Sequence, residues 1–127
     1  TAYAALTRIE NAAKKTYRPL VYICSPYAGN VERNVNLAKV YSRFALQNSC
    51  IPITPHLLYP QFMDDSDPEE RNLALFMGMV LLCKCEQLWV FGETISAGMN
   101  GEIEKAKKKN IPIRRFTSEL VEVTNHA

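Results

Sequence analysis

The sequence lacks the motifs of several common protein classes. Its four cysteines form no C-x-x-C pair and no Cys/His set with the spacing of a zinc site, so no metal is expected. Gly92, Gly98 and Gly101 do not match the dinucleotide-binding fingerprint, and the G-x-x-x-x-G-K-[ST] phosphate loop is absent. NAD-dependent redox chemistry and ATP hydrolysis are therefore not indicated, and no cofactor is expected. The longest apolar run, 73–83, is too short to span a bilayer, which takes about 20 residues.

The chain has no strong excess of charge, and we expect no signal peptide. Its formal net charge is +2, and the stretch "TAYAALTRIENAAKK" is amphipathic without the apolar core of a signal peptide. Lysines gather late on one predicted helix, where cations suit the negative helix end, and no aromatic residues interleave with them as in a nucleic-acid site. These lysines are Lys105, Lys107, Lys108 and Lys109. We expect a soluble, cytoplasmic protein that binds neither nucleic acid nor membranes, with Cys24 and Cys83 as buried free thiols.

Apolar runs and helical periodicities alternate along the 127 residues, 47% of which are hydrophobic. Such alternation predicts an α/β, Rossmann-like or flavodoxin-like three-layer sandwich with a mostly parallel sheet of four to five strands. Residues 1–17 are predicted to be a helical extension, either flexible or an arm onto a partner subunit, and 18–127 one domain. Pro52 favours an edge position or a strand start for the second strand. Strands are predicted over 19–24, 50–54, 87–92 and 111–116, and helices over 1–15, 31–47, 67–84 and 100–109.

Three segments follow predicted strands: "SPYAGN", "PHLLYPQFMDD" and "GETISAGMNGE". In parallel sheets, ligands bind at the carboxyl ends of the strands where the strand order reverses. Glu102 is expected in the first turn of the helix after the third strand, where the positive helix end lowers its pKa and keeps it ionised, as a nucleophile requires. The same position also fits ordinary helix electrostatics.

Other strand-end residues allow two interpretations each. Ser25, the backbone amides of "SPYAGN" and Arg33 fit an oxyanion or phosphate site, or a turn and a helix cap. Tyr22 is either a core residue or a residue whose hydroxyl reaches the cleft. His56 is either a loop residue or a ligand contact. Candidate second acids are Asp64, Asp65 and Asp67, the last also a helix cap.

Three stretches carry a resemblance to a known family: "VYICSPYAGN", "IPITPHLLYPQFMDD" and "CEQLWVFGETISAGMNGEIEKAKKKNIPI". Over about residues 18–116 the chain resembles the nucleoside 2-deoxyribosyltransferase-like superfamily, in particular a branch of small bacterial and phage proteins. The most specific match is "LWVFG" followed by S-x-G-M-x-x-E-I-x-x-A. The link to the characterised transferases rests on a Tyr-x-x-x-Pro pattern, Tyr22 and Pro26, and on an E-[ILV]-G-x-A motif that starts at Glu102.

The resemblance implies that Glu102 is a nucleophile and that Tyr22 contacts it. The carboxylate attacks the anomeric carbon of a nucleoside or nucleotide, the base leaves, and water or a second base resolves the covalent glycosyl-enzyme. Two positions depart from the family pattern. Glu104 replaces the glycine of the motif, and Glu93 stands in a loop where the transferases carry aspartates that hold the sugar and assist the base.

We therefore expect Glu102 and Tyr22 to be catalytic, and substrate contacts to come from the three strand-end segments. The expected contacts are Ser25, Pro26, Tyr27, Gly29, Asn30, Arg33, His56, Gly92, Glu93, Ser96, Gly98 and Met99. The main alternative is a binding module on the same fold that senses or sequesters a nucleotide-like ligand without cleaving it. A third interpretation is an interaction protein that works through the apolar helix.

The predicted helix 67–84 is apolar around most of its circumference. A helix on a sheet hides a stripe only, so a monomer would expose an apolar patch. We expect a homo-oligomer, at least a dimer, built through this helix, with Gly78 allowing a partner helix to come close. Related transferases complete their sites with residues from a neighbouring subunit, so the resemblance implies that assembly can also complete this site.

Overall fold

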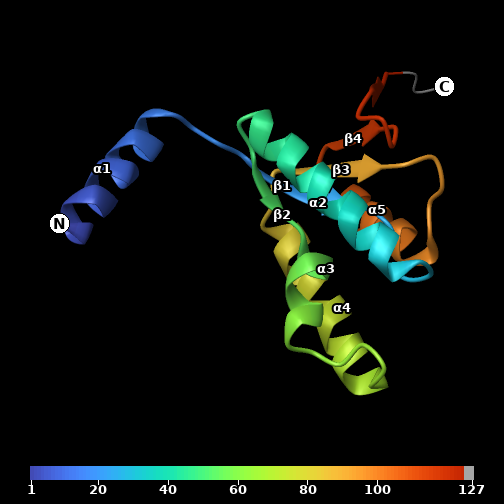
Figure 1. Cartoon of the computed structure of the whole chain (residues 1–127). Helices are drawn as coiled ribbons and strands as arrows, with labels where there is room; N and C mark the ends of the chain where they lie inside the picture. The colour runs from blue at the N-terminus through green and yellow to red at the C-terminus, as the bar shows by residue number, and fades with distance from the viewer. Residues whose placement is uncertain (125–127) are drawn as a thin grey trace.

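A five-stranded sheet lies at the centre of the fold, with helices on both faces (Figure 1). The computed structural model describes residues 1–124. The strand order is β2-β1-β3-β4-β5, in which the first four strands are parallel and β5 is antiparallel to β4. The strands are β1 (Leu20–Cys24), β2 (Ile51–Ile53), β3 (Gln87–Phe91), β4 (Ile113–Phe116) and β5 (Glu122–Val123).

The helices form two layers around this sheet. The α2 helix packs against one face, and α4 and α5 pack against the other. This arrangement confirms the predicted three-layer α/β fold, and the order 2-1-3-4-5 is that of flavodoxin-like sheets. The helical elements are α1 (Ala2–Lys15), α2 (Val31–Gln47), α3 (Pro55–Leu58), the 3₁₀ helix η1 (Tyr59–Gln61), α4 (Pro68–Cys83) and α5 (Ala97–Lys108).

The residues of β1 alternate between the two faces of the sheet, as in any strand. Val21 and Ile23 pack in the cluster on the α2 side, where aromatic side chains dominate. Tyr22 and Cys24 pack on the opposite side, among residues of α4 and α5. The β1 strand therefore delivers its hydroxyl and its thiol to the same face as Glu102 on α5.

Element boundaries agree with the sequence prediction at α4 and differ at α5. Asp67 caps α4 by accepting from the Glu69 backbone N–H at 3.0 Å. The α5 helix begins at Ala97 instead of residue 100, because the Ser96 hydroxyl caps it by accepting from the Met99 N–H at 3.2 Å. The prediction that Glu102 lies in the first turn is therefore wrong. Glu102 lies in the second turn of α5, beyond the reach of most of the helix-end charge.

Two further sequence predictions concern Pro52 and the cysteines. The edge position predicted from Pro52 is confirmed, because β2 is an edge strand. All four cysteines lie in the described part of the chain and are free thiols. The predicted burial holds for Cys24 but is wrong for Cys83, which is exposed because it lies at the last turn of α4 on a side that no other element covers.

The α4 helix is partly uncovered, as its all-round apolar sequence implies. Leu82 and Gly78 are buried, whereas Leu73, Phe76 and Val80 are exposed. The α1 helix forms over the residues predicted and projects away from the sheet (Figure 1). None of the described helices has the length and apolar character needed to cross a membrane.

Candidate functional site

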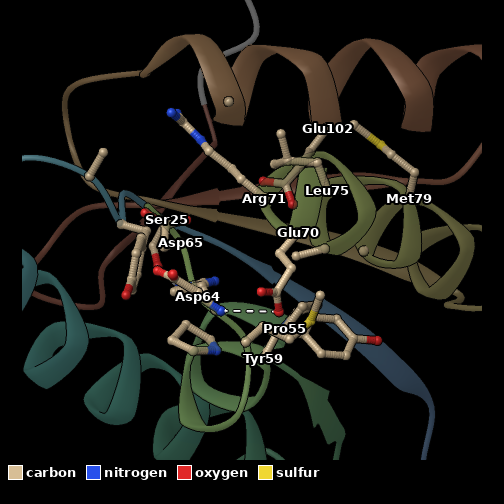
Figure 2. A pocket seen from close by; sticks show the side chains of 18 of the residues that line it. Ser25, Pro55, Tyr59, Asp64, Asp65, Glu70, Arg71, Leu75, Met79 and Glu102 are labelled. Carbon is tan, nitrogen blue, oxygen red and sulfur yellow. Dashed lines mark hydrogen bonds between the residues drawn. The ribbon is translucent and has the colours of Figure 1, made fainter. Parts of the chain in front are cut away.

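A cavity of about 230 Å³ opens beside the carboxyl end of β1, next to the point where the strand order reverses between β1 and β3. Its walls come from the end of β1, from residues 55–65, from α4 and from α5, and their side chains converge in Figure 2. The cavity lies at the edge of the sheet where the sequence predicted a ligand site, beside the carboxyl end of a parallel strand. Of the residues expected there, those that line it are Tyr22, Ser25, Tyr27, His56, Gly98 and Glu102.

Among the carboxylates that line this cavity, Glu102 is the one that lies beside the Tyr22 and Cys24 side chains. It is half-buried, and its removal from water raises its pKa to about 7, against hydrogen bonding from the Tyr22 hydroxyl and the Cys24 thiol, which lowers it. The prediction that the helix end would lower this pKa is wrong, because the carboxylate lies one turn too far along α5 and burial dominates. At pH 7 roughly half of the molecules carry the ionised form.

Tyr22 and Cys24 are both neutral donors toward Glu102. Burial and the neighbouring carboxylate raise the pKa of each well above its usual range. The Cys24 thiol also lies 3.8 Å from the carbonyl oxygen of Met99, which points it toward α5. Our sequence interpretation missed Cys24, although the two-residue period of a strand places it on the same face as Tyr22.

Gly78 of α4 makes room for the Tyr22 hydroxyl. It is buried, and a Cβ atom at this position would lie 3.3 Å from Tyr22 Oη and 4.0 Å from Pro55 Cβ. The prediction that Gly78 admits a partner helix is therefore wrong. The glycine faces inward, and its missing side chain lets α4 pack over the hydroxyl that contacts Glu102.

Ser25 and His56 form a hydrogen-bonded pair on another wall of the cavity. The Ser25 hydroxyl lies 3.0 Å from His56 Nε2, and Ser25 is buried. The Tyr27 ring lies edge-on to the imidazole, with 6.3 Å between the ring centroids. Burial lowers the pKa of His56 to about 4, so the imidazole is neutral at pH 7 and works as a polar contact instead of a cation.

We predict that His56 stays neutral across the physiological range. Its imidazole proton shifts should titrate with a midpoint near pH 4 in a pH series of NMR spectra, because the charged form is disfavoured in the buried site. Since folding lowers this pKa below the usual histidine value of 6.5, the stability from neutral His56 is present above about pH 6.5 and is lost as the pH falls toward 4. A midpoint above pH 6 in the folded protein would contradict the buried, neutral assignment.

The wall formed by the end of the 55–65 segment and the start of α4 is acidic. Asp64, Asp65 and Glu70 line it, and Arg71 is the only cation among the described lining residues. The Glu70 carboxylate accepts from the Asp64 backbone N–H at 3.3 Å (Figure 2), which ties the loop to α4. One oxygen of Asp64 accepts from the Ser66 hydroxyl and N–H, and these bonds lower the Asp64 pKa. Two of the candidate second acids, Asp64 and Asp65, therefore face the cavity.

The remaining expected contacts lie outside the lining of this cavity. Gly92 and Glu93 line a separate hollow near β4, and Glu93 accepts from the N–H and hydroxyl of Ser118 at 3.2 and 3.3 Å. Met99 is a core residue of α5. The side chains of Asn30 and Ser96 cap the first turns of α2 and α5. The expected contacts that do not line the cavity are Pro26, Gly29, Asn30, Arg33, Gly92, Glu93, Ser96 and Met99.

Several α4 residues that line the cavity were not among the site residues expected from the sequence. Arg71, Leu75, Gly78 and Met79 follow the i, i+4, i+7, i+8 spacing of one helix face, so the helical period would have grouped them. The spacing was not distinctive in the sequence, because nearly every position of α4 from Leu73 onward carries an apolar residue. Within residues 1–124, no three His, Cys, Asp or Glu side chains are grouped so that they could hold a metal ion.

The chain belongs to the family described as a domain of unknown function, DUF7768, whose model matches residues 19–116. The matched region runs from β1 to β4 and so includes every wall of the cavity. A search of curated proteins finds no match.

Two solved structures have a similar fold. One is a 2-deoxyribosyltransferase from the psychrotolerant bacterium Bacillus psychrosaccharolyticus, with a TM-score of 0.61 and 15% identity, where the match covers 84% of this chain and 77% of that enzyme. The other is a conserved protein from Enterococcus faecalis V583, with a TM-score of 0.54 and 20% identity, over 79% of this chain and 64% of that protein. At these identities the similarity establishes a shared fold.

Proposed function

We propose that the chain cleaves or transfers the N-glycosidic bond of a nucleoside or nucleotide, with Glu102 as the nucleophile. The main observation in favour is a half-buried carboxylate that faces a cavity of about 230 Å³ and meets two neutral donors, Tyr22 and Cys24. Such a carboxylate is poorly solvated and therefore more reactive once ionised. The fold shared with a 2-deoxyribosyltransferase supports the same reaction class.

In the proposed reaction, an ionised Glu102 oxygen forms a bond to C1′ of the sugar while the C1′–N bond to the base breaks. The electron pair of the broken bond stays on the base, which takes up a proton as it leaves. Water, or the nitrogen of a second base, then attacks C1′, releases Glu102 and gives up a proton. The Tyr22 hydroxyl orients the carboxylate by its hydrogen bond.

The proton for the leaving base needs a second acid, and the acidic wall offers candidates. Asp65 fits better than Asp64, because the hydrogen bonds from Ser66 hold the pKa of Asp64 low and disfavour its protonated form. Asp67 does not line the cavity and caps α4. We therefore assign the base to the side of the cavity formed by residues 55–71, and the sugar to the side formed by β1 and α5.

A 5′-phosphate would occupy the loop after β1. Arg33 lies in the first turn of α2, close to the backbone amides of that loop, although it does not line the cavity. We predict that a nucleotide binds about tenfold to a hundredfold more tightly than the matching nucleoside, since a charge-assisted pair contributes roughly 1.5–3 kcal/mol. Calorimetric titration of both ligands with wild type and with Arg33→Ala tests this. Equal affinities in the wild type would remove the phosphate from the proposal.

The proposed working unit is a homo-oligomer. The support is the exposed apolar side chains of α4, which soluble proteins rarely leave in water as a continuous patch. Because Leu75 belongs to the same helix and lines the cavity, a subunit packed on α4 lies next to the site. We also propose that a neighbouring subunit contributes residues that complete the site.

The decisive experiment is incubation with a panel of nucleosides and mononucleotides, followed by identification of the products by mass spectrometry. Release of the free base by wild type and not by Glu102→Gln supports the proposed reaction. Transfer is distinguished from hydrolysis by adding a second base and detecting the exchanged nucleoside. Ligand binding without turnover of any compound would instead favour the alternative of a binding module.

A further inference from the structure

Two apolar helix surfaces of this chain lack a partner within the described structure. The first, here called the α4 stripe, consists of Leu73, Phe76 and Val80, with exposed fractions of 50%, 65% and 40%. Their spacing of three and four residues places them along one side of the helix. This side points away from the sheet, because the buried residues of the same helix, Gly78 and Leu82, lie on the other side.

The second surface, here called the α1 stripe, consists of Tyr3, Leu6 and Ile9. These side chains recur every three residues and have exposed fractions of 81%, 58% and 64%. The α1 helix stands apart from the rest of the chain (Figure 1). An isolated helix of this length is marginal in water, so the α1 helix needs a surface against which to pack.

The linker that follows α1 directs the helix away from its own α4. The Tyr17 hydroxyl donates to the Glu86 carboxylate, and the same carboxylate accepts from the Leu20 N–H at 3.3 Å. These contacts hold the linker at the start of β1 and β3. In Figure 1 the helix projects outward from this anchor and stands clear of the other elements, α4 included. The α1 stripe is therefore placed to meet another molecule.

The two stripes match in length and in charge. Helices of 14 and 16 residues are about 21 and 24 Å long at 1.5 Å per residue. By its sequence, the α1 segment has a formal charge of +2. The α4 segment has a formal charge of −1, from Glu69 and Glu70 less Arg71. Opposite net charges favour the encounter of the two helices.

We propose that α1 of one molecule packs along the α4 stripe of a second copy of this chain, and that the exchange is reciprocal. A reciprocal exchange gives a closed two-fold dimer in which each stripe is used once. To reach the range of stable interfaces, the two helix contacts together have to bury on the order of 1,200–2,000 Å². This goes beyond an oligomer built through α4, because it identifies the surface that covers the helix. It does not depend on the proposed enzymatic activity.

The arrangement predicts that single substitutions in either stripe dissociate the dimer. The mass of the full chain is measured by light scattering after size exclusion at micromolar concentration, and the wild type should give twice 14.4 kDa. Leu6→Glu, Ile9→Glu and Phe76→Glu should each raise the dimer dissociation constant at least a hundredfold. All three positions are exposed and glutamate preserves helix propensity, so the fold should survive, which circular dichroism checks.

The matched control is Val40→Glu on α2, where an exposed apolar residue lies on the opposite layer. This variant should remain dimeric. A monomeric wild type would overturn the proposal. A dimer that Phe76→Glu dissociates but Leu6→Glu and Ile9→Glu leave intact would also overturn it, because α4 would then be covered by something other than α1.

Discussion

Glu102→Gln should abolish base release while the protein stays folded. The amide cannot attack C1′, and within the described lining no other carboxylate shares its contacts with Tyr22 and Cys24. We expect turnover to fall by on the order of a thousandfold or more, because the covalent step is lost. Initial rates on a substrate found in the panel measure this.

The same substitution should stabilise the protein at alkaline pH. Folding raises the pKa of Glu102 from 4.5 to about 7, so its stability contribution is complete below about pH 4.5 and is lost as the pH rises through 7. Glutamine stays neutral throughout. The variant should therefore be more stable than wild type at pH 8, by on the order of 1–3 kcal/mol, and the gain should vanish near pH 4, below the unfolded pKa of 4.5. Urea unfolding at both pH values measures the difference.

Glu104→Gln is the matched control. Glu104 lies on the same helix, but it is exposed and pairs with Lys107 at 3.5 Å on the surface. Its loss should leave turnover and the pH dependence of stability near wild type. If Glu102→Gln keeps near-normal turnover, another group is the nucleophile. If it loses activity without the gain in stability at pH 8, the carboxylate is less buried than the structure indicates.

Local sequence patterns predicted the framework of the site. Buried strands, the Asp67 cap and the helix that carries Glu102 all follow from periodicity and capping residues within a few positions. The placement of Glu102 at the cavity also followed, because the carboxyl ends of neighbouring parallel strands meet at one edge of the sheet. Each of these inferences uses information that lies within one element or in the order of the elements.

The environment of Glu102 could not be predicted in the same way. Its pKa is raised by burial among several elements and lowered by a thiol 78 positions earlier in the chain, at Cys24. The Ser25–His56 pair and the approach of Gly78 to Tyr22 are also contacts between distant elements. The error at α5 had a local cause. The Ser96 cap extends the helix through Gly98, a residue that usually marks a loop.

Tyr22→Phe should move the pH dependence of turnover to higher pH. The Tyr22 hydroxyl hydrogen-bonds to Glu102 and lowers its pKa, whereas burial raises it. Phenylalanine removes the hydrogen bond and keeps the burial, so the pKa of Glu102 should rise above about 7. A hydrogen bond to a charged group contributes roughly 1.5–3 kcal/mol, which corresponds to about one to two pH units. At pH 7 turnover should fall about tenfold or more, and it should recover as the pH rises toward 9.

Tyr41→Phe provides the matched control, since Tyr41 is buried against Phe91 on the opposite face of the sheet, with 4.3 Å between the ring centroids. This variant should keep the wild-type profile of rate against pH, measured from pH 5 to 9. A Tyr22→Phe profile that is lowered equally at every pH would mean that the hydroxyl acts on the substrate instead of on the carboxylate. A shift toward lower pH would contradict the hydrogen bond itself, because a carboxylate that loses a donor becomes harder to ionise.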